Sequence, residues 1–417
     1  MRITIHRGTN EIGGSCVEVE YNGTRLLLDA GTPLDDSPAA LPADIDAYAG
    51  VLISHSHQDH YGLVERLPED VPLYMGKVAW QFAQSLRLFT KTGDLLTHNP
   101  IPLEAGKTFR VGDISVTPYL ADHSSPDAFG FLLEAGGRVV YYTGDFRAHG
   151  RKSKTFDYLC SRLPRKMDAI LLEGTMMDRG NSAFASEREV EEGMVEAIRA
   201  ESGIVCLNCS AQNIDRMVSA FRAAKRSGRI LVVDIYTAWI LRLAQQLSAN
   251  IPDINWDGMR VLSHNRPAAG YYRNVKEHAE FFGGFLQDLY NSGNELWVQN
   301  LVDSPSKYLI KLSDYWLADI LDRLPGISST IIYSQWAGYL EEGTPQYNAK
   351  AASLKGRENS TFRLIHTSGH AVREDLMRLV GSVEPQTVIP LHTEHKNAYA
   401  EYFPNVHVLD DGEVFEL

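Results

Sequence analysis

The sequence is poor in cysteine, in long apolar runs and in basic residues. Four cysteines among 417 residues are too few for a disulfide framework, and the absence of a run of about 18 apolar residues argues against a transmembrane helix. The opening residues Met1–Ile5 are typical of a strand rather than of a signal peptide. We therefore expect a protein of the cytoplasm, with no membrane among its partners.

The balance of charge is acidic. There are 40 Lys and Arg residues against 53 Asp and Glu residues, which gives a formal net charge of −13 at pH 7. This balance argues against a generally basic surface for nucleic acid. The length fits two domains, and 44% hydrophobic residues are enough for sizeable cores. Any affinity for a polyanion must therefore come from local basic groups or from bound metal ions.

One short segment carries most of the chemistry that the sequence reveals. The segment His55–His60 reads His-Ser-His-Gln-Asp-His, directly after the apolar run Gly50–Ser54. An apolar run of this length is typical of a buried strand, and ligands in open α/β folds bind where such strands end. Imidazole and carboxylate are the usual ligands of zinc and related divalent metals. On an extended loop, alternate side chains of this segment could reach two different metal ions.

Three further candidate ligands also follow strand-like runs. His123 comes after the alternating run 114–119, Asp145 after the β-branched and aromatic run 139–143, and His392 after the apolar run 387–391. A lone residue of this kind is more often structural than a ligand. Their shared placement at strand ends indicates that several strands converge on one metal-binding edge.

In the order and spacing of these residues, the chain resembles hydrolases of the metallo-β-lactamase fold. The resemblance implies two zinc ions, each with its own set of side chains and one carboxylate in common. The ligands that it implies are His55, His57 and His123 for the first ion, Asp59, His60 and His392 for the second, and Asp145 as the bridge.

A long middle segment narrows the resemblance to the beta-CASP nucleases. Between the two parts of the lactamase-type sequence lie predicted strands at 203–207 and 229–234 and a predicted helix at 214–225. We therefore expect an α/β protein, a metallo-β-lactamase αββα sandwich with an inserted α/β beta-CASP domain. The division that we expect is residues 1–176 for the first part of the sandwich, 177–360 for the insertion and 361–417 for the return.

Local motifs are similar to those of ribonuclease J and its relatives. Glu173 and His370 resemble the first and second beta-CASP motifs, and a histidine at position 392 resembles the third in the form used by the RNA-processing branches. Three positions depart from the family: Gly174 stands where a serine is usual, Gln58 where a glutamate is usual, and Leu63 where a second glycine is common. None of these departures removes a predicted ligand.

The resemblance implies a metal-dependent ribonuclease that hydrolyses phosphodiester bonds of single-stranded RNA. A hydroxide activated by two zinc ions, or by manganese, would attack the phosphate. Exonucleolytic cutting from a 5′-monophosphate end and endonucleolytic cutting both stay open. So do a DNA nuclease with the same site, a metallo-hydrolase of thioesters or lactones, and assembly into a homo-oligomer.

Three residues receive catalytic roles from this resemblance. Asp59 belongs to the metal site, His370 would act as general acid toward the leaving 3′ oxygen, and Glu173 would orient His370 and keep it protonated. We expect the neighbouring residues His366, Ser368 and Gly369 to bind a 5′-phosphate, because a hydroxyl and a glycine amide are suitable phosphate ligands.

Two other groups of residues invite a functional interpretation. Arg147, Arg151, Lys152 and Lys154 follow the predicted bridging aspartate and are the better candidates for phosphate contact among the basic clusters. Cys206 and Cys209 have the spacing of a redox or metal motif, but no second pair accompanies them. We expect these two cysteines to pack in a core.

Overall fold

The computed structural model describes residues 1–35, 37–90, 94–179, 183–263 and 269–417. The chain forms two compact units. The first unit comprises Met1–Gln84, Asp94–Asn181 and Gly369–Leu417, and the second comprises Ser85–Gly93 and Ser182–Ser368.

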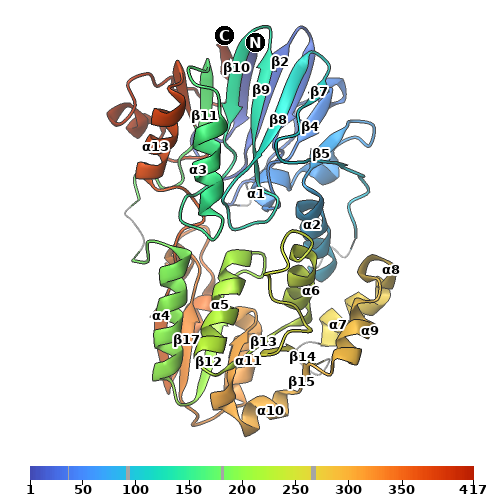
Figure 1. Cartoon of the computed structure of the whole chain (residues 1–417), viewed down its shortest axis with the longest axis vertical. Helices are drawn as coiled ribbons and strands as arrows, with labels where there is room; N and C mark the ends of the chain where they lie inside the picture. The colour runs from blue at the N-terminus through green and yellow to red at the C-terminus, as the bar shows by residue number, and fades with distance from the viewer. Residues whose placement is uncertain (36, 91–93, 180–182, 264–268) are drawn as a thin grey trace. The chain divides into compact units, whose positions relative to one another are not determined.

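Two sheets form the centre of the first unit (Figure 1). In spatial order the strands of the first sheet are β20 (Val414–Glu416), β1 (Arg2–Arg7), β2 (Cys16–Tyr21), β3 (Thr24–Leu28), β4 (Gly50–Leu52), β5 (Leu73–Met75) and β6 (Ile101–Pro102). Those of the second sheet are β19 (Thr387–Leu391), β11 (Ala169–Glu173), β10 (Arg138–Tyr142), β9 (Phe129–Ala135), β8 (Ile114–Leu120) and β7 (Phe109–Val111).

Three apolar clusters give this unit four layers. The central cluster joins side chains of β1, β2 and β3 to side chains of β8, β9 and β10. A second cluster lies between the outer face of the second sheet and the helices α3 (Ser153–Arg162) and α13 (Arg373–Val383). A third packs α1 (Gln58–Tyr61) and α2 (Lys77–Phe89) against the outer face of the first sheet. Helix, sheet, sheet and helix follow one another, which is the predicted αββα sandwich.

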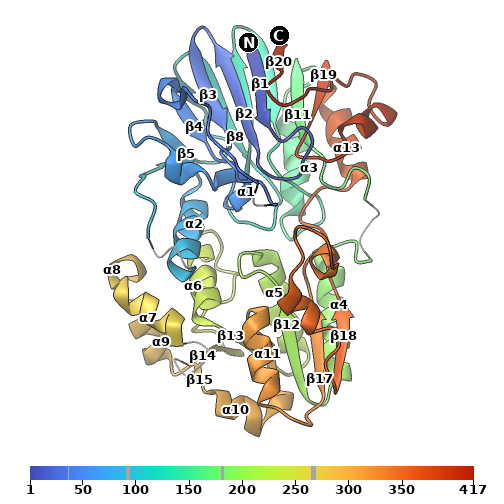
Figure 2. The same cartoon turned by 180° about the vertical axis from the view of Figure 1, so that it is seen from behind.

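The second unit is built on one sheet whose paired strands all run parallel (Figure 2). In spatial order its strands are β15 (Glu295–Leu296), β14 (Met259–Leu262), β13 (Ile230–Val233), β16 (Tyr308–Lys311), β12 (Ile204–Asn208), β17 (Ser329–Tyr333) and β18 (Ser360–Leu364).

Helices and short helical turns complete both units. The α-helices of the second unit are α4 (Glu187–Ala200), α5 (Ile214–Arg226), α6 (Ile235–Ala244), α7 (Ala269–Glu277), α8 (Ala279–Phe282), α9 (Phe285–Ser292), α10 (Val298–Asp303), α11 (Asp314–Asp322) and α12 (Ala349–Ser353). The 3-10 turns are η1 (Ile45–Ala47), η2 (Val64–Arg66), η3 (Pro305–Lys307), η4 (Ala337–Leu340) and η5 (Lys396–Glu401).

The elements predicted from the sequence are present. The run Gly50–Ser54 forms β4, and the segments predicted at 203–207, 214–225 and 229–234 form β12, α5 and β13. One segment lies elsewhere than expected. Residues Ser360–Leu364 pair with β17 in the second unit, although the sequence places all but the first of them in the returning part of the sandwich. This strand has only two apolar residues, Phe362 and Leu364, and none of its residues is buried, so its sequence does not reveal which sheet it joins.

The cysteine pair packs as expected. Cys206 is fully buried within β12, and the Cys209 sulfur lies 4.0 Å from that of Met217. Burial raises the pKa of the Cys206 thiol to about 12, so this cysteine is not a reactive thiolate at neutral pH.

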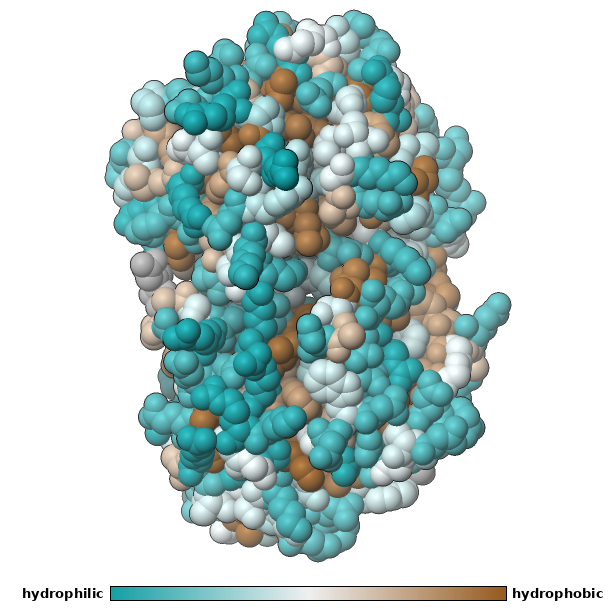
Figure 3. Space-filling view, in the orientation of Figure 1, coloured by the Kyte–Doolittle hydropathy of each residue, from teal (hydrophilic) through white to brown (hydrophobic). Residues whose placement is uncertain are grey.

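No helix within the described residues is long and apolar enough to cross a membrane. The face drawn in Figure 3 is mostly hydrophilic, and its apolar residues are dispersed in small groups. Single apolar residues on a surface are ordinary and mark no interaction site.

Candidate metal centre

The histidine-rich segment lies where β4 ends, as the sequence predicts. The chain leaves β4 through a short link, His57 stands at the N-terminus of α1, and Asp59 and His60 lie within this helix. A helix turn directs side chains three residues apart to one side, so that His57 and His60 can face a common point. The local sequence thus brings one strand end and one helix start to the same place.

One cluster unites three histidines and an aspartate. The Nε2 atom of His55 lies 3.0 Å from Nδ1 of His57, and Nε2 of His123 lies 3.2 Å from the same atom. The Oδ2 atom of Asp145 is 3.7 Å from Nε2 of His55. One potential ligand atom from each side chain lies within 4.8 Å of the others, which is the spacing expected around a single small cation.

A second cluster shares Asp145 with the first. Its members are Asp59, His60, Asp145 and His392. The Oδ2 atom of Asp59 lies 3.3 Å from Nε2 of His392, and Oδ2 of Asp145 lies 3.3 Å from Nε2 of His60. All seven ligands predicted from the sequence therefore lie in two adjacent clusters, with the predicted bridging carboxylate between them.

Orientation of the imidazole rings provides a test of whether these residues fit metal ions. The Nδ1 atom of His60 lies 2.7 Å from Asp29 Oδ2, Nδ1 of His123 2.9 Å from the Gly369 carbonyl, and Nδ1 of His392 2.9 Å from Thr175 Oγ1. In metal sites the ligating histidine usually has its second nitrogen held in this way. Among the residues that the structure describes, the buried Nε2 atom of His60 has no hydrogen-bond partner. The donor set therefore fits divalent metal ions.

Asp29 and Thr175 are functional candidates that sequence reasoning missed. Asp29 is fully buried and also accepts hydrogen bonds from Ser54 and Tyr142. Its φ angle is +60°, and that of His392 is +52°, a backbone region that non-glycine residues seldom adopt. The only signal in the sequence was that Asp29 closes the apolar run of β3, which is too common to single it out.

Charge distribution in the first cluster suits neutral histidines around an ionised carboxylate, whereas in the second cluster Asp145, Asp29 and Asp59 outweigh burial and raise the pKa of His60 well above its usual value. Burial lowers the pKa of His55 and His123 well below the usual value, and neighbouring imidazoles act in the same direction. Burial alone would raise the pKa of Asp145, but the surrounding His392, His60 and His370 outweigh it and hold the pKa well below its usual value. Neutral imidazole and ionised carboxylate are the forms that bind metal ions, so metal binding at the second cluster would release a proton from His60.

Glu173 and His370 lie beside the clusters. The Nδ1 atom of His370 is 3.4 Å from Glu173 Oε1 and 3.7 Å from Asp145 Oδ2. Burial would lower the pKa of His370, but Asp145 and Glu173 outweigh it and raise the pKa to about 9. Glu173 is 1% exposed and accepts backbone hydrogen bonds from Thr175 and Ala371. It is therefore fixed in place rather than a strand-end carboxylate facing water.

The three predicted phosphate ligands are divided between the units. Gly369 belongs to the first unit, where its carbonyl faces His123. His366 and Ser368 belong to the second unit, where Nη1 of the buried Arg216 lies 3.2 Å from Nδ1 of His366. A phosphate-binding role for these three residues stays a prediction.

Arg147 does not have the environment expected of a phosphate-contacting residue. Its side chain is fully buried, and its Nε atom lies 3.8 Å from Asp122 Oδ1. Its backbone amide donates to the carbonyl of the same aspartate at 2.7 Å. Lys152 donates to the carbonyl of Ser125 at 3.1 Å. The position of Arg147 next to Asp145 suggested a role in binding, but its side chain turns into the protein and stabilises the loop.

The departure at Gly174 has a structural explanation. A Cβ atom on Gly174 would lie 1.9 Å from the hydroxyl oxygen of Tyr399. Tyr399 is fully buried and donates to the Leu172 carbonyl at 3.0 Å. Tyr399 thus occupies the space that a serine side chain would need, and the change at position 174 preserves the end of β11.

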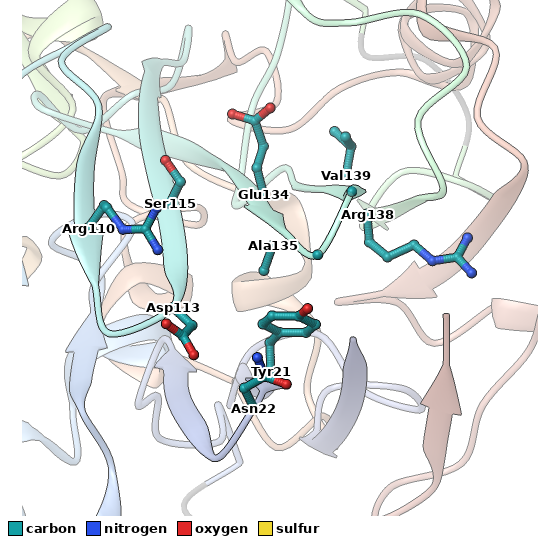
Figure 4. Close-up of a pocket in the computed structure, with 11 residues that line it drawn as sticks. Tyr21, Asn22, Arg110, Asp113, Ser115, Glu134, Ala135, Arg138 and Val139 are labelled. Atoms are coloured by element: carbon teal, nitrogen blue, oxygen red, sulfur yellow. The ribbon is translucent and has the colours of Figure 1, made fainter.

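A surface hollow lies at the strand ends opposite the two clusters, and its lining does not resemble a metal site. It measures about 520 Å³, and its lining includes Tyr21, Arg110, Asp113 and Glu134 (Figure 4). Arg138 extends away from Tyr21 and pairs with Asp168 at 2.7 Å. The charged side chains that line the hollow are solvent-exposed and of both signs, so it is not a candidate active site.

Comparisons with known protein families agree with this geometry. The family described as "Beta-lactamase superfamily domain" matches residues 24–203, and "Zn-dependent metallo-hydrolase RNA specificity domain" matches residues 360–408. The first match covers most of the strand ends that carry the two clusters, and the second covers the segment with His370 and His392.

Two curated relatives span nearly the whole chain, and a third covers about half of it. Ribonuclease J of Mycobacterium tuberculosis (strain ATCC 25618 / H37Rv) is 24% identical over 94% of this chain and 68% of its own length. Ribonuclease J 2 of Streptococcus pyogenes is 22% identical over 98% of this chain and 74% of its own length. Endoribonuclease ysh-1 of Neurospora crassa is 27% identical over 46% of this chain and 25% of its own length.

The fold as a whole also occurs in a solved structure. A protein of unknown function from Enterococcus faecalis V583 superposes with a TM-score of 0.78 at 21% sequence identity, over 100% of this chain and 99% of the other. At this identity the likeness concerns the fold alone.

Proposed function

We propose that this chain, a metallo-β-lactamase fold hydrolase of the beta-CASP type, is a ribonuclease that hydrolyses phosphodiester bonds of single-stranded RNA with two divalent metal ions. The observation that carries the proposal is the pair of clusters that share Asp145, with His370 directly beside them. The names of the relatives, ribonuclease J and an endoribonuclease, support RNA as the substrate. The cytoplasmic location expected from the sequence is part of the same proposal.

The residues divide into metal-holding and proton-handling groups. The first ion would be held by His55, His57 and His123, the second by Asp59, His60 and His392, and both by Asp145. Zinc is the metal that this histidine-rich donor set favours, and manganese is the alternative. When bound, two such ions supply an activated water at neutral pH and neutralise charge on the phosphate.

His370 would donate the proton that the leaving 3′ oxygen needs. Its ring lies beside Asp145, and hence next to the phosphate that the clusters would bind. Glu173 orients the ring by its contact at 3.4 Å and favours the protonated form. His366, Ser368 and Gly369 would hold a terminal 5′-phosphate, an arrangement that favours exonucleolytic cutting from that end.

A cleavage assay on matched oligonucleotides tests the proposal. The substrates are RNA with a 5′-monophosphate, RNA with a 5′-triphosphate, single-stranded DNA and duplex DNA. The control is the Asp59→Ala/His60→Ala variant. We expect loss of RNA only with the intact protein, and mononucleotides released from the 5′-monophosphate end. Preferential cutting of DNA would identify a DNA nuclease. If none of the four is cut although two metal ions bind, a thioester or lactone substrate replaces the nucleic acid.

The role of His370 has its own expected result. Removing a general acid typically slows catalysis by about 10²–10⁴-fold, so His370→Ala should lower kcat by this factor without releasing the metal ions. His395→Ala is the matched control, because His395 is more exposed and pairs with the carboxylate of Asp178 at 3.7 Å. Equal rates for His370→Ala and the unaltered protein would contradict the assignment.

A further inference from the structure

Lys311 is a buried cation that the proposed chemistry does not use. It is the last residue of β16 and is 4% exposed. Its ammonium group donates to the Oγ1 atom of Thr237 at 2.9 Å. Within the described residues, no carboxylate forms an ion pair with this ammonium. A buried charge without a counter-charge is costly, because the interior does not replace the water that it loses.

The position of Lys311 in the sheet is where parallel α/β folds bind ligands. The chain moves from β12 through α5 to β13, β14 and β15 in one direction, and from β16 through α11 to β17 and β18 in the other. Because such crossovers are right-handed, α5 and α11 lie on opposite faces of the sheet, as Figure 1 and Figure 2 show. The loops after the neighbouring strands β12 and β16 therefore leave toward opposite faces of the sheet, and open α/β folds bind ligands at strand ends of this kind.

Pairing within the sheet places Lys311 between these strand ends. Lys311 is paired with Leu207 of β12 on one side and with Val233 of β13 on the other. It therefore lies between the two strand ends from which α5 and α6 begin.

Other polar groups gather at the same edge. Thr237 is fully buried and accepts the hydrogen bond from Lys311 through its oxygen, so its own hydroxyl hydrogen can still be donated to a second acceptor. Gln212, on the loop after β12, donates to the hydroxyl of Tyr236 at 2.9 Å. The carboxylate of Asp234 caps α6 by accepting the amide hydrogen of Thr237 at 2.6 Å. The carboxylate of Asp234 is thus bound to the N-terminus of α6. The ammonium group of Lys311 has only the hydroxyl of Thr237 as its hydrogen-bond partner among the described residues.

We propose that Lys311 and Thr237 form a phosphate-binding site at the carboxyl edge of the second sheet. The ligand is a phosphate group of the single-stranded RNA backbone, and in this respect the inference rests on the proposed function. An ammonium group is a compact point charge that suits a phosphate. The site is separate in sequence and in structural unit from the two clusters of the metal centre.

Salt dependence of RNA binding tests the site in the metal-loaded protein. A cleavage-resistant phosphorothioate RNA carrying a fluorophore is titrated with the protein at several salt concentrations. Loss of one phosphate contact should reduce the slope of log Kd against log salt by about 0.7, which corresponds to about fivefold weaker binding near 0.1 M salt. We expect this change for Lys311→Met and a retained slope for Lys311→Arg.

Lys307→Met is the matched control. Lys307 is exposed and precedes β16, at the amino end of the strand that Lys311 closes. The substitution Lys307→Met removes the same charge close to the same strand. We expect it to leave the slope of log Kd against log salt unchanged. An unaltered slope in Lys311→Met, or equal changes in both variants, would overturn the proposal.

Two further measurements separate this inference from the proposed function. Lys311→Met should unfold at the same temperature as the unaltered protein or at a higher one, because a buried charge kept for ligand binding lowers the stability of the free protein. A markedly lower unfolding temperature would make Lys311 structural and refute the site.

If the unaltered protein binds no RNA, the proposed function fails, and binding of inorganic phosphate then tests the site by itself. Phosphate should raise the unfolding temperature of the unaltered protein but not of Lys311→Met; an equal rise in both would refute the site.

Discussion

Asp29 shows how a single residue can control a site that it does not enter. It is bound to Nδ1 of His60 at 2.7 Å, to the Ser54 hydroxyl and to Tyr142. A carboxylate on the far nitrogen of a ligating histidine fixes the ring and increases its basicity. The second cluster therefore depends on a residue that lies 31 positions before the histidine.

Replacing Asp29 should weaken metal binding while the fold persists. Asn is the suitable replacement, because the left-handed backbone at this position tolerates it. We expect Asp29→Asn to lower metal affinity by about 10–100-fold, the range for loss of such a partner, in a competition titration against a chelator. Asp168→Asn is the control, since Asp168 is a buried acid that pairs with Arg138 near the other ends of the strands. A similar loss in both variants would show that the effect is general.

Glu18 offers a pH-dependent test away from the metal centre. Burial alone would raise its pKa, but hydrogen bonds from His6, Arg25 and Tyr48 outweigh it and hold the pKa well below the usual value. The unfolded chain therefore takes up the proton first as pH falls. The stability that these bonds supply is fully present above the unfolded pKa of about 4.3 and is lost as pH falls through the folded value.

The matching experiment compares two glutamates of β2. Glu18→Gln should lower the free energy of unfolding at pH 7, and the difference from the unaltered protein should shrink as the pH is lowered below about 4. Glu20→Gln should have little effect at either pH, because Glu20 pairs with the half-exposed Arg2 at the surface. Urea unfolding at several pH values measures both. A Glu18 effect that grows toward acid pH would contradict the prediction.

The end of β11 illustrates how an element adapts to a change in its sequence. Gly174 has no room for a side chain, because Tyr399 of η5 fills the space beside it. We expect Gly174→Ser to cost about 1–3 kcal/mol through overpacking. In a Tyr399→Leu background the same substitution should cost less, since the atoms that it meets are gone. Denaturant unfolding of the four proteins of this double-mutant cycle measures the coupling free energy between positions 174 and 399. Additive effects of the two substitutions would contradict the predicted clash between the serine and Tyr399.

The elements that a sequence predicts well are those with a strong local signal. The strands β4, β8, β10 and β19 follow from apolar or alternating runs, and the residues placed at their ends reach the two clusters together. Asp29 and Thr175 could not be predicted, because their importance arises from contacts made only after the strands assemble. The burial of Arg147 could not be predicted either, because in the sequence a charged residue beside a candidate site looks the same whether it binds a ligand or packs in the protein. The sheet to which β18 belongs is decided by long-range pairing with β17.

At the scale of the whole molecule, the second unit includes a segment from an early part of the chain. Residues Ser85–Gly93, which include the end of α2, belong to this unit. Trp239 donates to the Ser85 hydroxyl at 2.8 Å, and Asn274 donates to the Leu88 carbonyl at 2.8 Å. Phe89 is 7% exposed. The core of the second unit is therefore incomplete without residues that precede it by about a hundred positions in the sequence.

Phe89 is the residue through which this dependence can be measured. Its ring centroid lies 4.9 Å from those of Tyr236 and Tyr271 and 5.6 Å from that of Phe282. Truncation of a buried phenylalanine to alanine typically costs about 3–5 kcal/mol. Five of the six tryptophans lie in the second unit, at positions 239, 256, 297, 316 and 336, so tryptophan fluorescence reports mainly on its unfolding. Phe89→Ala should therefore move the fluorescence transition to a lower urea concentration.

A matched truncation in the first unit shows whether the two units unfold separately. Phe156 of α3 is 2% exposed and stacks on Phe146 at 5.7 Å between ring centroids. Phe156→Ala removes a comparable side chain from a different core. Because each unit has its own core and domains generally fold as units, Phe156→Ala should shift the fluorescence midpoint less than Phe89→Ala does. Equal shifts would mean that the whole chain unfolds in one cooperative step, and that the early segment stabilises both units together.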